Sequence, residues 1–126
     1  IRDSGILHRL LLIDSFNDLI GNPIFGPSWE GLVIENILCN FREWNPWFYR
    51  SAKGDELDLI LTKGTKILAI ECKASTAPQL TKGFWNALED VQPDHTFVIA
   101  PVNEEYDIKQ NVTVCGISNF LQRQSP

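Results

Sequence analysis

The stretch GDELDLILTKGTKILAIECK, residues 54–73, decides the fold of this chain. It predicts two strands, Glu56–Leu61 and Lys66–Lys73, joined by a tight turn at residues 63–65. Side chains of a strand alternate between its two faces. In the first strand we expect one apolar face and one mixed face, made of Leu57, Leu59 and Leu61 against Glu56, Asp58 and Ile60. In the second strand we expect the same division, with Leu68, Ile70 and Cys72 against Ile67, Ala69, Glu71 and Lys73. This pattern is typical of a sheet buried on both sides, with a polar site opening at one end.

Length and composition predict one globular domain. The chain has 126 residues, of which 44% are apolar and 21% charged, so wholesale disorder is not expected. We expect residues 1–25 to form a helical extension and residues 26–126 to form the core. The chain contains no Met, and we therefore interpret it as a fragment of a longer protein.

The sequence predicts no membrane contact and a reducing, cytoplasmic location. No apolar run is long enough to cross a membrane, and no signal peptide is present. Cys39, Cys72 and Cys115 are odd in number, far apart and free of a C-x-x-C spacing. They are interpreted as small buried hydrophobic residues, and neither a disulfide nor a zinc framework is expected.

Charge is distributed unevenly along the chain. The net charge of −5 argues against a non-specific coat for nucleic acid. Residues 50–82 nevertheless hold six of the eleven basic residues and only four acids, whereas residues 83–108 hold six acids and no base. The two predicted strands therefore lie in the locally basic part of the chain.

A long helix is predicted before the strands. Ser28 is its expected N-cap, and apolar residues at helical spacing extend it from Trp29 to about Trp44, where Pro46 follows as a breaker. Glu30 falls on the same stripe as Val33 and Ile37, although a carboxylate on a buried stripe is costly unless a cation meets it. Glu35 points away and should be exposed.

The remaining elements complete an α/β pattern. Two short helices are expected in the extension, starting at Asp3 or Ser4 and at Ser15. The further predictions are a strand at 47–52, a helix at 80–91, strands at 96–100 and 112–115, and a closing helix at 117–123. A helix between two strands implies parallel pairing. The fold class is therefore α/β, with a mixed central sheet flanked by helices in the order αβββαβ.

The charged residues of this pattern suggest a metal site. Asp58 and Glu71 lie on adjacent predicted strands, Lys73 follows Glu71 on the same face, and Glu30 covers that side from the helix. Three carboxylates at one place repel each other unless a cation joins them, and oxygen ligands suit Mg²⁺ or Mn²⁺. A neighbouring lysine can orient or deprotonate a water molecule, or stabilise a developing negative charge. This set suits metal-assisted hydrolysis of a phosphodiester.

Asp58, the Glu71-x-Lys73 pair and Glu30 resemble the PD-(D/E)XK nuclease superfamily, whose restriction-endonuclease-like core has the same order of elements. The wider sequence looks like the C-terminal domain of unassigned function of predicted AAA-type ATPases. The matching stretches are Asp3–His8, Gly26–Glu35, Tyr49–Ile60 and Ile70–Ser75.

The resemblance implies a role for each matching position. Asp58 and Glu71 would be the principal metal ligands, with Glu30 and the Cys72 carbonyl as further ligands, and Lys73 would act on the attacking water. The partner would be nucleic acid, most commonly DNA, and an ATPase domain would precede this one. Leu57 replaces the proline of the motif, and after Ser75 only Lys82 offers a phosphate contact. No G-x-x-x-x-G-K-[ST] motif is present, so this chain alone should not hydrolyse ATP.

Other interpretations stay open at this point. An E-x-K triplet also arises by chance in exposed strands. Glu56 is interpreted as a rim residue, Arg50 and Lys53 as solvated turn charges, and His8 and His95 as structural. Trp29, Trp44, Trp47 and Trp85 are expected in the core rather than as base-stacking platforms. Two functional classes remain, a metal-dependent nuclease domain and a catalytically silent nuclease-like module that binds nucleic acid or protein.

Overall fold

The structure, a computed structural model, describes residues 26–124. The elements in chain order are α2 (Gly26–Asn40), β1 (Asn45–Arg50), β2 (Glu56–Lys63), β3 (Lys66–Cys72), α3 (Lys82–Val91), β4 (His95–Ile99), β5 (Glu105–Lys109), β6 (Val112–Cys115) and α4 (Ile117–Gln124). The predicted extension over residues 1–25, with its two short helices and His8, lies outside the described residues.

Six strands form one mixed sheet in the order β1-β2-β3-β4-β6-β5. The first three strands, all predicted from the sequence, make an antiparallel meander. The chain then passes through α3 and returns as β4, which pairs parallel with β3, and β6 pairs parallel with β4. β5 pairs antiparallel with β6 and forms one edge, while β1 forms the other. The predicted mixed α/β sheet with αβββαβ order is confirmed.

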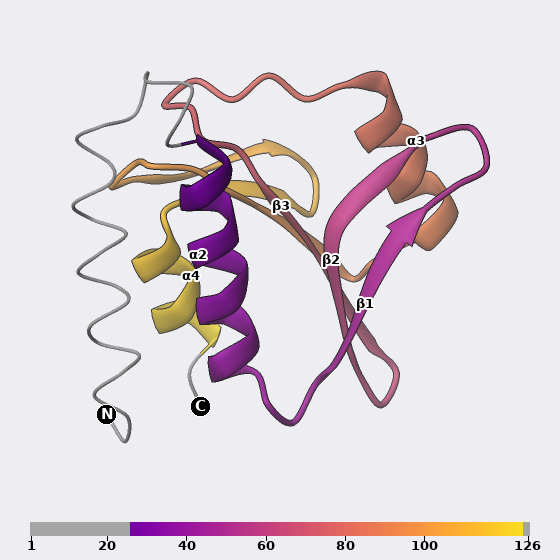
Figure 1. Cartoon of the computed structure of the whole chain (residues 1–126), viewed down its shortest axis with the longest axis horizontal. Coiled ribbons are helices and arrows are strands. Elements are labelled where there is room, and N and C mark those ends of the chain that lie inside the picture. The colour runs from indigo at the N-terminus through magenta and orange to yellow at the C-terminus, as the bar shows by residue number, and fades with distance from the viewer. Residues whose placement is uncertain (1–25, 125–126) are drawn as a thin grey trace.

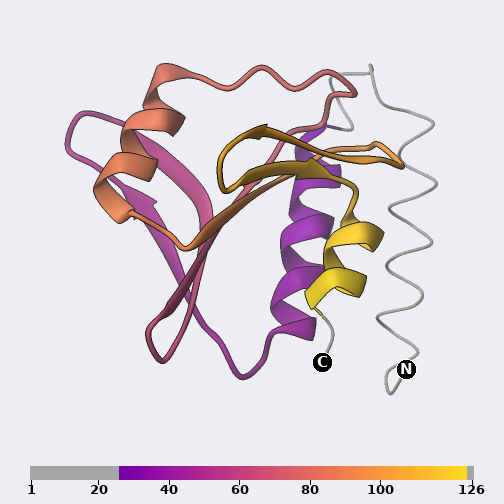
Figure 2. The same ribbon diagram turned by 180° about the vertical axis from the view of Figure 1, so that it is seen from behind.

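Helices cover both faces of the sheet. Figures 1 and 2 show α2 and α4 side by side on one face and α3 on the other. A large core cluster fills the α2 side, where Trp29, Val33 and Ile37 pack on apolar residues of β2, β3 and β4. A smaller cluster fills the α3 side and includes Phe84 and Ala87. Burial on both faces explains why β3, β4 and β6 read as nearly continuous apolar runs.

The first long helix is shorter than its apolar spacing predicts. It begins at Gly26, two residues before the expected cap at Ser28, and ends at Asn40. Trp44 lies beyond that end but packs edge-to-face on Phe41, with ring centroids 5.9 Å apart, which imitates helical spacing. Pro46 does not end the helix; it lies in β1, an edge strand, where a missing N–H is tolerated.

Three further predictions from the sequence differ from the structure. β5 lies between the predicted strands 96–100 and 112–115, where no strand was predicted, and all five of its residues are exposed. α3 begins at Lys82, two residues later than predicted, with the Thr81 hydroxyl accepting the Phe84 N–H at 3.2 Å. Trp47 was expected in the core and is 57% exposed on the edge strand, so that prediction is wrong.

A β-bulge in β2 overturns the predicted face of Leu57. Trp47 pairs with Ile60 and Tyr49 with Leu57, so two residues of β2 oppose one residue of β1. Leu57 therefore packs in the α3-side cluster with Ile60, whereas Leu59 packs on the α2 side. Strict alternation assumed a regular pleat, and the extra residue breaks it.

Candidate functional site

The bulge places Asp58 where the ladder between β2 and β3 stops. The regular pairing of these strands ends at Leu59 with Ile70. Beyond that pair, side chains replace the backbone ladder: the Asp58 carboxylate accepts the Cys72 N–H at 2.8 Å, and the Asp58 N–H donates to the Glu71 carboxylate at 3.2 Å. The two carboxylates are thereby held against the opened strand ends.

Lys73 and Glu30 complete the same neighbourhood. The Lys73 ammonium lies 3.6 Å from the second oxygen of Glu71, Oε2. Glu30, near the start of α2, accepts the N–H of Ala74 at 3.2 Å through Oε2. The predicted exposure of Glu35 on the same helix is confirmed. The structure therefore brings Glu30, Asp58, Glu71 and Lys73 to one end of the sheet. We call these four residues the carboxylate cluster.

Burial and mutual repulsion raise the pKa values of two carboxylates in the cluster. Burial, with the negative charge of Asp58 as a second cause, raises the pKa of Glu71 from 4.5 to about 7. Burial also raises the pKa of Glu30, partly offset by the hydrogen bond from Ala74, and Asp58 raises it further. Lys73 lowers both values but does not cancel these effects.

The donor chemistry of the cluster fits Mg²⁺ or Mn²⁺, which prefer carboxylate and carbonyl oxygens. The Oδ1 atom of Asp58 and the Oε1 atom of Glu30 take no part in the hydrogen bonds to Cys72 and Ala74. Among residues 26–124, however, no three His, Cys, Asp or Glu side chains are grouped so that they could hold a metal ion as they stand. The metal site therefore remains a prediction.

The Cys72 side chain takes no part in the predicted metal site, for which only the backbone carbonyl of this residue was proposed. Its thiol is buried, and burial raises its pKa well above the usual value, with the nearby carboxylates as further causes. The thiol is therefore protonated at neutral pH and is a core group. The predicted ligand is the backbone carbonyl. Cys72 and Cys115 are buried, as predicted, whereas Cys39 is only half-buried.

Other predicted positions lie around the cluster or away from it. Glu56 is exposed and forms a 3.0 Å ion pair with Arg50, consistent with a rim position. Lys53 is exposed in the β1–β2 turn, and Lys82 is exposed at the start of α3. Trp29 is fully buried, while Trp44 and Trp85 are half-buried against the two cores.

His95 has a structural position. Its Nε2 atom lies 2.8 Å from the buried hydroxyl of Thr113, and that hydroxyl donates to the Asp107 carboxylate at 2.7 Å. Its ring packs on Phe97 with centroids 4.5 Å apart. These contacts tie β4, β6 and the edge strand β5 together, at a place separate from the carboxylate cluster.

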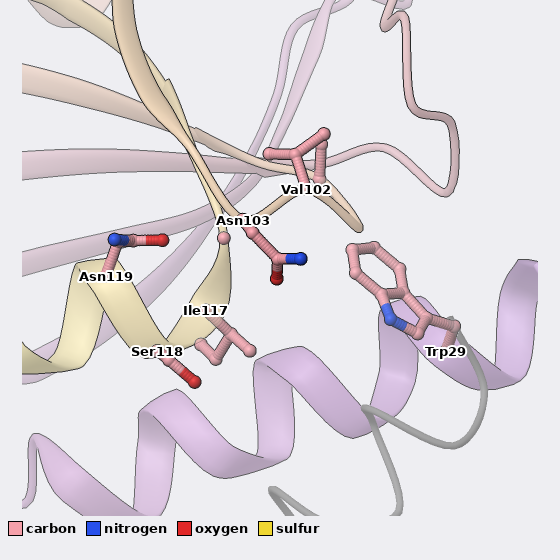
Figure 3. Close-up of a pocket in the computed structure, with 8 residues that line it drawn as sticks. Trp29, Val102, Asn103, Ile117, Ser118 and Asn119 are labelled. Carbon is pink, nitrogen blue, oxygen red and sulfur yellow. The ribbon is translucent and has the colours of Figure 1, made fainter. Parts of the chain in front are cut away.

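Two hollows in the described part of the molecule are separate from the cluster. One, of about 30 Å³, lies between Trp29, Val102 and the start of α4 (Figure 3). This volume suits about one water molecule. A more open groove between α3 and the β5–β6 turn is lined in part by Trp85 and Lys109. Neither hollow includes a carboxylate of the cluster.

Sequence reasoning missed the groups that hold the site. The backbone N–H groups of Cys72 and Ala74 position two carboxylates, and main-chain groups leave no signal in a sequence. The bulge at Asp58 was also missed. An acid placed between apolar strand residues could have suggested it, since bulges often lie next to functional sites.

Comparison with known proteins identifies a family without an assigned function. The family described as "Domain of unknown function (DUF4143)" matches residues 25–120. Uncharacterised proteins of Mycobacterium bovis and Mycobacterium tuberculosis are each 31% identical over 121 residues, 96% of this chain. The chain spans 27% of the length of each of these relatives. No solved structure matches it.

Proposed function

The chain belongs to the DUF4143 family, and we propose that it is a metal-dependent nuclease-like domain that hydrolyses phosphodiester bonds of DNA. We further propose that it has a restriction-endonuclease-like PD-(D/E)XK core and is attached to an ATPase domain in the complete protein. The order of its elements and the positions of Asp58, Glu71 and Lys73 support this proposal.

Each member of the cluster takes a role from its chemistry. Asp58 and Glu71 would hold Mg²⁺ or Mn²⁺, with Glu30 and the Cys72 carbonyl as further ligands. The bound metal would stabilise charge on the phosphate and lower the pKa of a bound water. Lys73, beside Glu71, would orient the attacking water and stabilise the negative charge that develops on the phosphate.

The single observation that carries the proposal is the convergence of three carboxylates and one ammonium at opened strand ends. Asp58 and Glu71 come from neighbouring strands, and Glu30 comes from a helix 28 residues before Asp58 in the chain. A buried carboxylate with a pKa near 7 is costly for a purely structural role. A cation would remove that cost.

A second candidate is a nuclease-like module that binds nucleic acid or protein without cutting. The backbone N–H groups of Cys72, Ala74 and Asp58 favour this candidate. They donate to Asp58, Glu30 and Glu71 and so occupy one oxygen of each carboxylate. In this case the cluster would be a structural network that holds α2 on the strand ends.

Calorimetric titration with Mg²⁺ and Mn²⁺ separates the two candidates. A metal site predicts saturable binding in the wild type and loss of binding in Asp58→Ala. Asp55→Ala, in the β1–β2 turn, is the matched control and should bind normally. No binding by the wild type, or equal binding by Asp58→Ala, would contradict the metal site.

Catalysis is tested with the complete protein, Mn²⁺ and single-stranded, linear and plasmid DNA, with and without ATP. Lys73→Ala should lower the rate of cleavage by about 10²- to 10⁴-fold, the usual contribution of such a group. Lys66→Ala, an exposed lysine at the other end of β3, should cleave like the wild type. Metal binding without cleavage of any substrate would favour the silent module.

A further inference from the structure

The most exposed large apolar side chain of the described residues lies beside the carboxylate cluster. Phe48 is 71% exposed at the middle of the edge strand β1. The two residues of the bulge, Asp58 and Leu59, lie opposite it on β2, because its neighbours pair with Ile60 and Leu57. Adjacent strands separate such Cα atoms by about 5 Å.

Phe48 faces the side of the sheet from which Glu30 reaches the cluster. Ile60 and Leu57, the partners of Trp47 and Tyr49, belong to the α3-side core, so Trp47 and Tyr49 also face α3. Alternation then turns Phe48 to the opposite side, which α2 covers. Phe48 therefore lies on the Glu30 side of the cluster, whereas Glu71 alternates with Ile70 and Cys72 and faces α3.

Exposed basic residues lie near this end of the sheet although the chain is acidic overall. Arg50 follows on the same strand and forms an ion pair with Glu56, and Lys53 lies in the next turn; both are exposed. That turn packs on the start of α3, where the Asp55 side chain lies against Gly83 and Lys82 is exposed. Figure 1 shows the β1–β2 turn beside α3.

We propose that Phe48 stacks on an unpaired base next to the scissile phosphate, so that the substrate is single-stranded DNA or a single-stranded end. This inference rests on the proposed function. Exposed aromatic rings beside basic groups bind single strands by stacking, whereas bases of an intact duplex are already stacked. A second copy of the chain pairing along β1 is disfavoured, because Pro46 removes an N–H from that edge.

Trp47 supplies the matched control. It is the neighbouring exposed aromatic residue on the same edge, but it faces α3 and its indole N–H donates to the Thr62 hydroxyl at 2.9 Å. If any exposed aromatic residue supported binding, the two positions would behave alike. If stacking occurs beside the cluster, only Phe48 should matter.

The test measures the affinity of the complete protein for a fluorescein-labelled single strand of about 12 nucleotides and for the blunt duplex of the same sequence. A Lys73→Ala background with Mg²⁺ prevents cleavage during the titration. We expect tighter binding of the single strand and a loss of about 5- to 100-fold in Phe48→Ala, the usual effect of one stacked base. Phe48→Tyr should restore binding, and Trp47→Ala should retain it.

Three results would overturn the inference: equal losses in Phe48→Ala and Trp47→Ala, preference for the duplex, or a change of oligomeric state in Phe48→Ala with unchanged DNA affinity. The last would identify β1 as a protein contact. Failure of the proposed function is recognised separately. If single-strand binding depends on Phe48 but no substrate is cleaved, this inference stands and the proposed nuclease activity is rejected. If cleavage depends on Lys73 but not on Phe48, the nuclease activity stands and this inference is rejected.

Discussion

Burial makes the negative charge of Glu71 costly in the folded protein. The Glu71 side chain is nearly buried, lies beside Asp58 and is only partly balanced by Lys73, so its pKa is raised from 4.5 to about 7. The folded protein then keeps a proton that the unfolded chain releases near pH 4.5. The contribution of this proton to stability is complete below pH 4.5 and is lost as the pH rises to about 7.

Glu71→Gln should therefore stabilise the metal-free protein at neutral pH. The amide keeps an acceptor for the Asp58 N–H but carries no charge. We expect its free energy of unfolding to exceed that of the wild type by up to about 3 kcal/mol at pH 7–8, and the gain to shrink towards pH 4.5. Urea denaturation between pH 4.5 and pH 8 measures the difference.

Glu56→Gln is the control for this comparison, because Glu56 is exposed on the neighbouring strand and pairs with Arg50 at the surface. Its effect should be within about 0.5 kcal/mol at every pH. A Glu71→Gln gain that does not vary with pH would show that burial of charge is not its cause.

The residue types of the cluster could be predicted from the sequence, but their bonds could not. Acids at Asp58 and Glu71 interrupt apolar strands, and Glu30 falls on a core stripe, so spacing suggested the group, although it placed Glu30 on the wrong side of the sheet. The hydrogen bonds from the Cys72 and Ala74 amides depend on where the ladder ends. That end is set by a bulge, which strand periodicity does not encode.

At the scale of elements, the junction of β6 and α4 depends on a glycine. Gly116 is buried between the two, and a Cβ added there would collide with the Val102 carbonyl. Gly116→Ala should therefore lower the free energy of unfolding by about 1–3 kcal/mol, since a packed backbone cannot move away cheaply. A lower urea midpoint with an unchanged m-value would measure this loss.

Gly31 offers the opposite case within α2. It is exposed, and an added Cβ meets nothing within 4 Å among the described residues. Gly31→Ala should raise stability by about 0.5–1 kcal/mol, because alanine loses less backbone entropy in a helix. Equal losses at Gly31 and Gly116 would contradict the steric explanation.

Elements with a strong apolar pattern were predicted well, and elements at the edges were not. β6 falls at its predicted bounds, because all four residues are buried. β5 was missed because an edge strand with no buried residue has no core face to reveal it. The helix α2 was extended too far because Trp44 packs on Phe41 from outside the helix. Tertiary contacts imitate or hide the local period in these cases.

At the scale of the whole molecule, the sheet order explains how distant residues meet. The meander places the start of β2 next to the end of β3. α2 packs on the opposite face from Glu71, whose pairing partner Val98 belongs to the α3-side cluster, and Glu30 reaches the chain just after β3 from there. The prediction that the helix carrying Glu30 covers the Glu71 side of the sheet is therefore wrong. A cation bound there would link helix and strands, and its binding should therefore stabilise the entire fold rather than one loop.

This linkage predicts a thermal shift that depends on pH. Mg²⁺ or Mn²⁺ at about 100 times its Kd should add about 2.7 kcal/mol and raise the Tm by about 5–10 °C at pH 8. Binding requires ionised Glu71, so the affinity should fall about tenfold for each pH unit below 7, and the shift at a fixed metal concentration should shrink accordingly. Glu30→Gln should reduce the shift at pH 8 and Asp58→Asn should remove it, whereas Glu35→Gln, on the exposed side of the same helix, should leave it unchanged. An equal shift in Asp58→Asn would place the metal elsewhere, and a shift that grows as the pH falls would exclude Glu71 as a ligand.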